Sequence, residues 1–319
     1  MLFSPTTLHI PDGFLSTAVS IAGWFLAVIF VGIALRQTKD QLGERQVPLM
    51  GVIAAFIFAA QAINFPVAAG TSGHLLGGTL AAIVLGPWAG TLVMTAVISV
   101  QALLFQDGGL LAMGWNILNM GVITAFTGFA VYMLVVRFLG TTTRSRLIGG
   151  FIGAWLSVVA SAIATAIELA ISGTSPLSLG LPTMAGVHVI IGLGEAVITI
   201  GAIGLLQASR PQVLTTGETA PGRRTAMFTL VGLLVALGVS ALSPLASEHP
   251  DGLEFIAELQ GFLGLAQESS YELMPDYTLP FLSDPVLTTI LAVASGTMVV
   301  FGLAWFIARN SAKRGAVGD

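Results

Sequence analysis

Long runs of apolar residues alternate with short polar segments along this chain of 319 residues. A helix that crosses the hydrocarbon core of a bilayer needs about 20 mostly apolar residues, within a range of roughly 17–25. The third and fourth runs are short, and only Gly86–Gly90 divides them. The pattern predicts nine membrane helices, at 16–35, 48–65, 74–88, 90–105, 110–136, 147–172, 186–207, 226–245 and 286–308.

Charge predicts the orientation of these helices. With nine spans, every basic residue lies on one face of the membrane, which the positive-inside rule identifies as the cytoplasmic face. The N-terminus is then outside and the C-terminus inside. Merging the two short runs into one span would break this agreement. The twelve basic residues are Arg36, Lys39, Arg45, Arg137, Arg144, Arg146, Arg210, Arg223, Arg224, Arg309, Lys313 and Arg314. The four histidines fall on the external face: His9, His74, His188 and His249.

Composition supports an all-α polytopic membrane protein. Hydrophobic residues make up 55% of the chain and charged residues only 9%, whereas soluble domains carry about 25% charged residues. The absence of cysteine excludes disulfides, thiolate metal sites and cysteine nucleophiles. The basic clusters lack interleaved aromatic residues, so nucleic-acid binding is not expected.

Two polar segments divide the chain. Residues 209–225 form a predicted cytoplasmic linker. Residues 246–285 contain eight Asp or Glu residues and no Lys or Arg, which predicts an acidic external loop between the last two helices. We therefore expect a seven-helix domain at 1–208 and a two-helix unit at 226–319.

Two histidines stand beside turns or small residues at the external face. His9 precedes Pro11-Asp12-Gly13, a sequence that favours a tight turn, although His9 taken alone is better explained as a surface histidine in a flexible tail. His74 follows Gly70-Thr71-Ser72-Gly73 and opens a predicted helix. Small neighbours leave space around this imidazole, so the two histidines together indicate a binding site.

His188 and Glu195 are seven residues apart in one predicted helix. They therefore project from the same face, two turns apart. A carboxylate inside the bilayer is costly and is by default functional. An acid paired for helix packing accounts for Glu195 equally well, and both explanations stay open. For His188, support of a metal ligand is favoured over direct ligation.

Other polar side chains lie toward the outer ends of predicted helices, among them Asn64, Gln101 and Asp107. Hydrogen bonds between membrane helices contribute about 0.6–2 kcal/mol each, and most of these residues are expected to form such bonds. Some can also accept the second N–H of a metal-bound histidine.

Histidines and carboxylates without cysteine favour a borderline first-row metal, and imidazole suits nickel, cobalt, copper and zinc. No G-x-x-x-x-G-K-[ST], H-E-x-x-H or G-x-S-x-G motif occurs. Their absence argues against an ATPase, a zinc metalloprotease and a serine hydrolase.

Several of these stretches resemble one family, the substrate-capture membrane subunit of cobalt/nickel energy-coupling-factor transporters (CbiM/NikM). The resemblance covers 9–207. Pro250–Glu254 (PDGLE) resembles the signature of the small accessory subunit (CbiN/NikN), so the chain looks like a fusion of both. The CbiM/NikM-like stretches are His9–Leu15 (HIPDGFL), Gly70–Gly78 (GTSGHLLGG), Leu85–Gly90 (LGPWAG), Gln101–Gly109 and His188–Glu195.

The resemblance implies a metal site made by the N-terminal amine, the amide nitrogen and imidazole of a histidine in second position, and a further histidine. The matching residues are His9 and His74. Here eight residues precede His9, so the amine of that site would exist only if the chain starts at Leu8, with a Leu-type start codon read as Met. Retention of Met1 in an intact-mass measurement would contradict this start.

The expected function is capture of external Co²⁺ or Ni²⁺ as transported substrate, without an organic cofactor, in a bacterial or archaeal cell membrane. The resemblance implies a transmembrane coupling subunit and cytoplasmic ATPase subunits as partners. A stand-alone secondary carrier or channel is the alternative, although the polar residues cluster in the outer half. A membrane metalloenzyme that uses His188 and Glu195 is a third possibility, without a recognisable catalytic motif.

Overall fold

The computed structural model describes residues 9–41, 46–68, 70–209 and 223–316. Within these residues, seven helical segments are long and apolar enough to cross a membrane. A helix satisfies its own backbone hydrogen bonds, which is what a chain in hydrocarbon requires. The prediction of an all-α polytopic membrane protein is confirmed. The seven segments are Thr17–Lys39, Pro87–Phe105, Met113–Leu139, Thr143–Ile171, Leu177–Ala208, Thr225–Leu245 and Pro285–Ala312.

The elements that build these segments follow the chain in order. Residues 210–222 of the predicted linker lie outside the described residues. The transmembrane part contains α1 (Thr17–Gln41), α2 (Val47–Gln61), α3 (Gly78–Leu85), α4 (Pro87–Val100), the π-helical turn η1 (Gln101–Phe105), α5 (Met113–Ile117), the π-helical turn η2 (Leu118–Ile123), α6 (Thr124–Leu139), α7 (Thr143–Ile171), α8 (Leu177–Ser209), α10 (Arg223–Ser240) and α12 (Pro285–Ala316).

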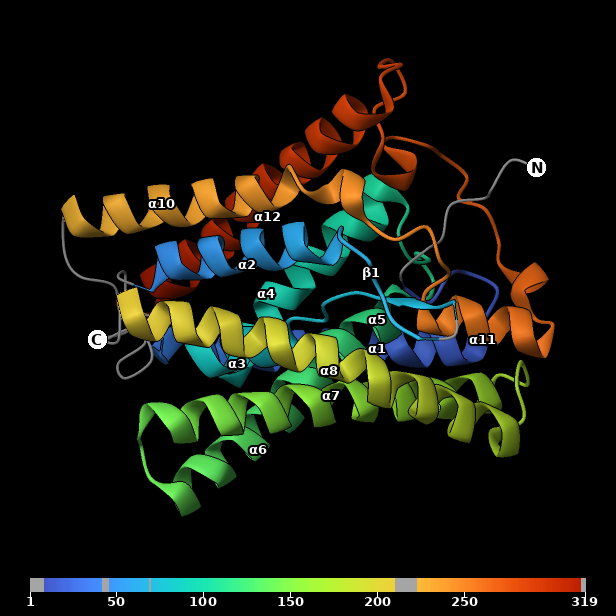
Figure 1. Cartoon of the computed structure of the whole chain (residues 1–319), viewed down its shortest axis with the longest axis horizontal. Coiled ribbons are helices and arrows are strands. Elements are labelled where there is room, and N and C mark those ends of the chain that lie inside the picture. Colours follow the sequence, from blue (N-terminus) through green and yellow to red (C-terminus); the bar gives the residue numbers. More distant parts are fainter. Residues whose placement is uncertain (1–8, 42–45, 69, 210–222, 317–319) are drawn as a thin grey trace.

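Short elements gather at one end of the bundle, opposite the end where α8 stops and α10 begins (Figure 1). The two strands pair antiparallel, with Phe65 opposite Gly73. These elements are β1 (Phe65–Pro66), β2 (Ser72–Gly73), the 3₁₀ turns η3 (Ser243–Leu245), η4 (Leu263–Leu265) and η5 (Pro275–Tyr277), and α11 (Gly252–Gln260).

The predicted third span at 74–88 is wrong as a continuous helix. Residues 74–77 are not helical, and α3 has only eight residues, or about 12 Å of length at 1.5 Å per residue. Non-helical backbone at membrane depth is tolerated only where protein surrounds it. Gly90 lets α3 and α4 approach closely, because a Cβ there would lie 2.9 Å from the backbone nitrogen of Ala82. The second span is also short, since α2 has 15 residues.

The seventh predicted span begins earlier than expected, at Leu177 instead of 186. Pro182 lies inside α8, near its start. Because proline has no backbone N–H, the first turns of α8 lack one backbone hydrogen bond. His188 therefore lies three turns into the helix, not at its beginning.

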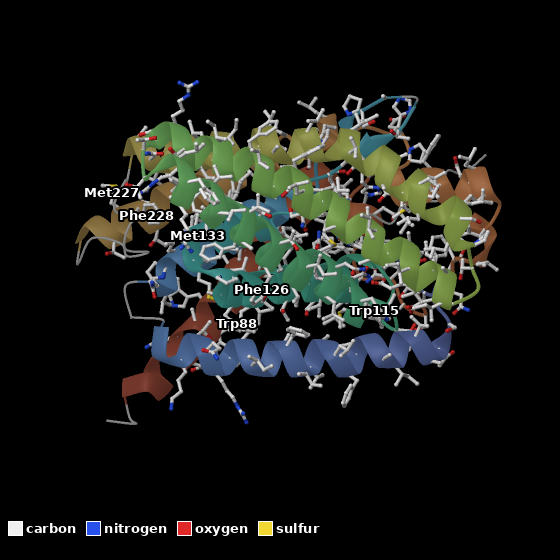
Figure 2. The ribbon with its side chains drawn as sticks, turned by 90° about the horizontal axis from the view of Figure 1, so that it is seen from below. Trp88, Trp115, Phe126, Met133, Met227 and Phe228 are labelled. Carbon is white, nitrogen blue, oxygen red and sulfur yellow. The ribbon has the colours of Figure 1, made fainter. Side chains whose placement is uncertain are left out.

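The bundle has two sides. In Figure 1, α2 lies beside α10 and α12 on one side, while α7 lies between α6 and α8 on the other. Figure 2 shows α1 along one edge of the bundle, with Trp115 near its inner face. The Trp115 Nε1 group donates to the carbonyl oxygen of Val19, 2.6 Å away. Large apolar side chains on the outer face of α1, such as Phe25, are exposed, as expected for contact with lipid.

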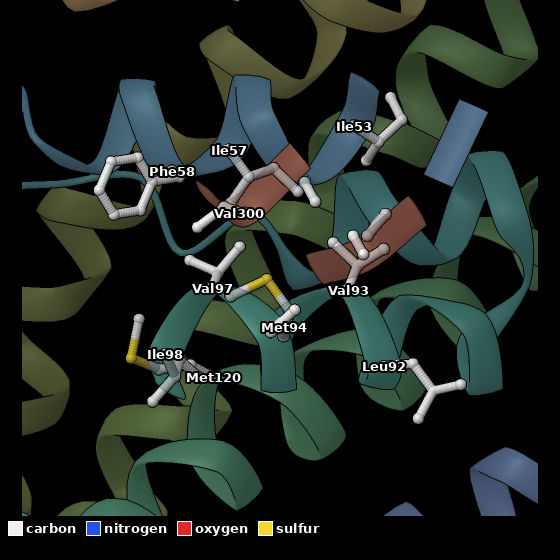
Figure 3. Close-up of a cluster of buried hydrophobic side chains, with 14 of the residues drawn as sticks. Ile53, Ile57, Phe58, Leu92, Val93, Met94, Val97, Ile98, Met120 and Val300 are labelled. Atoms are coloured by element: carbon white, nitrogen blue, oxygen red, sulfur yellow. The ribbon is translucent and has the colours of Figure 1, made fainter. Parts of the chain in front are cut away.

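The main core joins α4 to both sides of the bundle. Ile57 and Phe58 of α2, Val97 of α4 and Val300 of α12 are fully buried in it (Figure 3). The two C-terminal helices therefore share a core with the rest of the chain and pack as part of the same bundle.

Candidate metal centre

The N-terminal segment is held in place by the Asn116 side chain and by its own Asp12 carboxylate. The Asn116 side chain accepts from the Ile10 N–H and donates to the Ile10 carbonyl, both at 3.1 Å. The Asp12 carboxylate accepts three consecutive backbone N–H groups, those of residues 110–112, at 2.9–3.0 Å. These contacts bury His9, which is 2% exposed.

His9 is paired with Asp107. Its Nδ1 atom lies 3.0 Å from Asp107 Oδ1 and 3.3 Å from the Asp107 carbonyl oxygen. Both partners are acceptors, so Nδ1 carries the proton. Burial lowers the pKa of His9, but the adjacent Asp107 carboxylate outweighs burial, and the pKa is raised overall. Burial raises the pKa of Asp107 and His9 lowers it, with a net lowering. The expectation that Asp107 supports a histidine agrees with this geometry.

His74 lies in the non-helical segment before α3 and is 7% exposed. Its Nδ1 donates to the Leu75 carbonyl oxygen at 3.0 Å, which leaves the imidazole lone pair on Nε2. The ring meets the His9 ring edge to face, with 5.5 Å between centroids. Two imidazoles that share an ion at metal–nitrogen distances of about 2.1 Å have centroids roughly 4.5–6.4 Å apart, depending on the bond angle. The observed spacing falls within that range.

His9 and His74 line one small cavity of about 60 Å³. Polar side chains from four further parts of the chain reach this cavity: Asn116 and Asn119, Ser161 and Thr165, His188, and Asp251. The His9 Nε2 atom and the Asn119 Oδ1 atom are buried, and neither has a hydrogen-bond partner within the described residues. No three His, Asp or Glu side chains of the described residues form a ready metal site. Two imidazoles therefore need further ligands, and residue 8, whose amine the family resemblance implies as one of them, lies outside the described residues.

His188 and Glu195 have different surroundings. His188 lines the cavity, and its Nδ1 lies 2.8 Å from the Met184 carbonyl oxygen. Glu195 is not among the residues that line it. Its two carboxylate oxygens accept the backbone N–H groups of Leu76 and Gly77, which open α3. This geometry favours the packing explanation of Glu195: the carboxylate caps a half-helix and holds the segment that carries His74.

The other two expected supporting residues do not touch either histidine directly. Gln101 donates to the Tyr277 hydroxyl at 3.2 Å. Asn64 accepts the Ser247 N–H through its backbone carbonyl at 2.8 Å. Asn64 therefore connects the β1 region to the C-terminal unit, and its side chain does not line the cavity.

The PDGLE segment closes one wall of the cavity, which sequence reasoning did not anticipate. Asp251 lines the cavity and caps α11 by accepting the Glu254 N–H at 2.7 Å. Burial raises the pKa of Asp251 to about 7. The Pro250 carbonyl accepts the Ser72 N–H at 2.8 Å, so the segment is bound to the strand beside His74. The Asp-Gly pair before an apolar run is a helix N-cap signal, but it does not indicate which cavity the cap lines.

A second, larger cavity of about 510 Å³ shares His9 with the first, on the end of the bundle that the charge pattern predicts to be external. Among the described residues, no Lys or Arg side chain lines it, whereas four carboxyl side chains do: Glu254, Glu268, Glu272 and Asp276. Burial and neighbouring carboxylates raise the pKa of Glu254 to about 7 and that of Asp276 to about 6. We name this space the external acidic cavity. His9 and Leu253 line both cavities, so the two spaces are adjacent at this wall.

Comparisons with known proteins place the chain in a family. Residues 9–213 match the family model "Cobalt uptake substrate-specific transmembrane region", and residues 225–313 match the PDGLE domain. A putative fused nickel transport protein of Archaeoglobus fulgidus is 36% identical, over 95% of this chain and 98% of that protein. A probable fused nickel transport protein of Lactiplantibacillus plantarum is 31% identical over 93% and 97%. The cobalt transport protein CbiM of Sorangium cellulosum is 33% identical over 65% and 94%.

A comparison with solved structures supports the same family. The crystal structure of a truncated transition metal transporter is 33% identical and superposes with a TM-score of 0.56 over 63% of this chain and 98% of that one. The expected resemblance to both subunits is thus confirmed, and the chain is a multi-pass protein of a prokaryotic cell membrane. It belongs to the CbiM family of cobalt/nickel transport membrane proteins and carries a C-terminal PDGLE domain.

Proposed function

We propose that this chain is the metal-capturing subunit of an ATP-driven importer of Ni²⁺ or Co²⁺ of the energy-coupling-factor type, and that the external cation is bound at His9 and His74. The observation that carries the proposal is the pair of buried imidazoles, 5.5 Å apart, on one 60 Å³ cavity. Imidazole nitrogen suits both metals. The relatives named as nickel or cobalt transport proteins support this choice of substrate.

The external acidic cavity supplies a route to this site. Four carboxyl groups without a basic neighbour on the same wall create a negative potential that concentrates a divalent cation. The loop 246–285 provides all four groups, so the C-terminal unit assists loading.

Energy comes from partner proteins. The chain has no phosphate-binding loop, so we assign ATP hydrolysis to cytoplasmic ATPase subunits and the coupling to a transmembrane partner subunit. A stand-alone carrier would need a polar path across the whole bilayer. The buried core that α2, α3 and α4 share is instead dominated by apolar side chains, such as Leu80, Val84 and Val97.

Calorimetric titration of the purified chain with Ni²⁺ and Co²⁺ tests the capture site. His9→Ala and His74→Ala are expected to abolish tight binding. His249→Ala is the matched control, because His249 is an exposed residue of the external loop. Equal binding by all three variants would refute the assignment. Proteoliposomes that contain only this chain should accumulate no metal, and accumulation would favour the secondary carrier.

A further inference from the structure

An apolar groove of about 580 Å³ runs between α8 and α10, with residues of α2 and α3 as its floor. Every described residue that lines it is apolar or glycine. The floor residues Ile53 and Leu80 are buried, whereas Met227 and Val231 on the α10 wall are about half exposed. In Figure 1, α2 lies between α10 and α8, and Figure 2 shows Met227 and Phe228 at one end of the bundle. The groove therefore follows the seam between the CbiM-like domain and the PDGLE unit.

Two glycines shape the walls of this groove. A Cβ at Gly232 would lie 2.5 Å from Val52 Cγ1, so α10 packs closely on α2 at that point. A Cβ at Gly201 of α8 would meet no atom within 4 Å. The α8 wall thus carries no side chain at Gly201, and the space between α8 and α10 is left open there.

The dimensions of the groove suit an acyl chain better than a helix. Its α8 wall runs from Ile198 to Leu206 and its α10 wall from Met227 to Val235, each about 12 Å long at 1.5 Å per residue. Because one leaflet of the hydrocarbon core is about 15 Å thick, the groove fits within a single leaflet. Its volume over that length gives a mean width of about 8 Å, which is less than the 10–12 Å of a helix with side chains.

Basic residues surround the end of the groove that the charge pattern predicts to be cytoplasmic. Arg223 and Arg224 begin α10, one turn before the groove-lining Met227. Across the groove, Gln207 of α8 donates to the first residue of α7 at 2.7 Å, and Arg144, the next residue, is exposed. Within the described residues, the last three turns of α8 and the whole of α10 contain no Asp or Glu. This end of the groove is therefore complementary in charge to an anionic headgroup.

We propose that the groove binds one anionic phospholipid of the cytoplasmic leaflet, with an acyl chain between α8 and α10 and the headgroup at Arg223 and Arg224. Basic pockets between membrane helices on the cytoplasmic side recognise such headgroups. The bound lipid contacts both walls and so joins α8 of the first domain to α10 of the PDGLE unit. The groove shares no lining residue with the metal cavity, so this site is independent of the proposed metal capture.

Gly201→Phe tests the acyl-chain part of the site. The new ring enters open space in the groove, because an added Cβ there meets no atom within 4 Å. Gly302→Phe is the matched control, since Gly302 of α12 also has open space but does not line the groove. Native mass spectrometry of the full chain with added phosphatidylglycerol measures binding. We expect one bound lipid per chain in wild type and G302F, and an affinity lower by about 10-fold or more in G201F, since the ring displaces methylene groups from contact.

The double variant Arg223→Gln/Arg224→Gln tests the headgroup part. The control Arg36→Gln/Arg309→Gln removes two exposed basic residues elsewhere on the predicted cytoplasmic face. We expect R223Q/R224Q to bind phosphatidylglycerol about 10–30-fold more weakly than wild type, and the control to change affinity less than about two-fold. Phosphatidylcholine with the same acyl chains should bind wild type and both variants equally.

The absence of cysteine allows a test in a bilayer with a single attached fluorophore. Gly201→Cys and Gly302→Cys are labelled and placed in phosphatidylcholine vesicles that contain a minor share of phosphatidylglycerol. Brominated phosphatidylglycerol should quench the label at position 201 more strongly than the label at position 302. Brominated phosphatidylcholine should show no such preference for position 201.

Equal phosphatidylglycerol binding by wild type and G201F would overturn the proposal, as would equal losses in the two double variants. Equal affinity of wild type for the two lipids would overturn the choice of an anionic headgroup. Shielding of position 201 from both brominated lipids would show that protein, such as a second copy of this chain, occupies the groove instead of a lipid.

Discussion

Glu195 allows the most direct test of how the fold supports the metal site. Its two carboxylate oxygens accept the N–H groups of Leu76 and Gly77, two and three residues after His74. The substitution Glu195→Gln keeps the size of the side chain but leaves one acceptor oxygen and turns an NH₂ group toward the other N–H. We therefore expect the segment 74–77 to lose its anchor to α8.

The magnitude follows from the bonds that are lost. A hydrogen bond to a charged group contributes about 1.5–3 kcal/mol, and a buried N–H without a partner costs about 1–3 kcal/mol. Glu195 is fully buried, so solvent cannot replace the carboxylate. We expect E195Q to destabilise the segment by about 2–4 kcal/mol. Metal binding must then restore the order of the segment, and affinity falls by at most roughly 700-fold, the factor that corresponds to 4 kcal/mol.

Glu168→Gln is the matched control. Glu168 is also a buried carboxyl in a membrane helix, but its one hydrogen bond is accepted from Asn119 Nδ2 at 3.0 Å, and an amide oxygen can accept it equally. Hydrogen exchange at the Leu76 and Gly77 amides, with Ni²⁺ titration of both variants, measures the effect. Wild-type protection and affinity in E195Q would refute the capping argument, and equal losses in both variants would show a general effect of charge removal.

Three other perturbations have clear expected outcomes. Asp12→Ala removes the acceptor of three backbone N–H groups at 110–112 and should destabilise the chain by about 2–4 kcal/mol in thermal unfolding; an unchanged midpoint would contradict this. Gly252→Ala places a Cβ 2.9 Å from His188 Cε1, so Ni²⁺ affinity should fall several-fold while Gly264→Ala, in open space, should not change it. Burial raises the pKa of Asp251 to about 7, so the folded apo protein binds this proton more tightly than the unfolded chain, and its stability should fall as pH rises from about 4 to 7. D251N should flatten that part of the profile, by about 4 kcal/mol at most, and an identical slope would refute the assignment.

The hydrophobic pattern was enough to predict the class and most of the membrane segments, because one helix carries its own backbone hydrogen bonds. It failed at 74–88, where the N–H groups of Leu76 and Gly77 are satisfied by Glu195 on another helix. A periodicity argument assumes local hydrogen bonding, and so it extended α3 across a segment whose partners are remote.

The candidate site, like the fold, was only partly predictable from the sequence. Motif and spacing were enough to single out His9 and His74 as candidate ligands and Asp107 as a candidate supporting residue, because imidazole and carboxylate chemistry depends on residue type. Only the tertiary structure decided that Glu195 accepts the N–H groups before α3, that Asp251 lines the same cavity as His9 and that Tyr277 donates to Asp107. Those contacts join positions more than 100 residues apart, and their geometry is set by the packing of whole helices rather than by any local pattern.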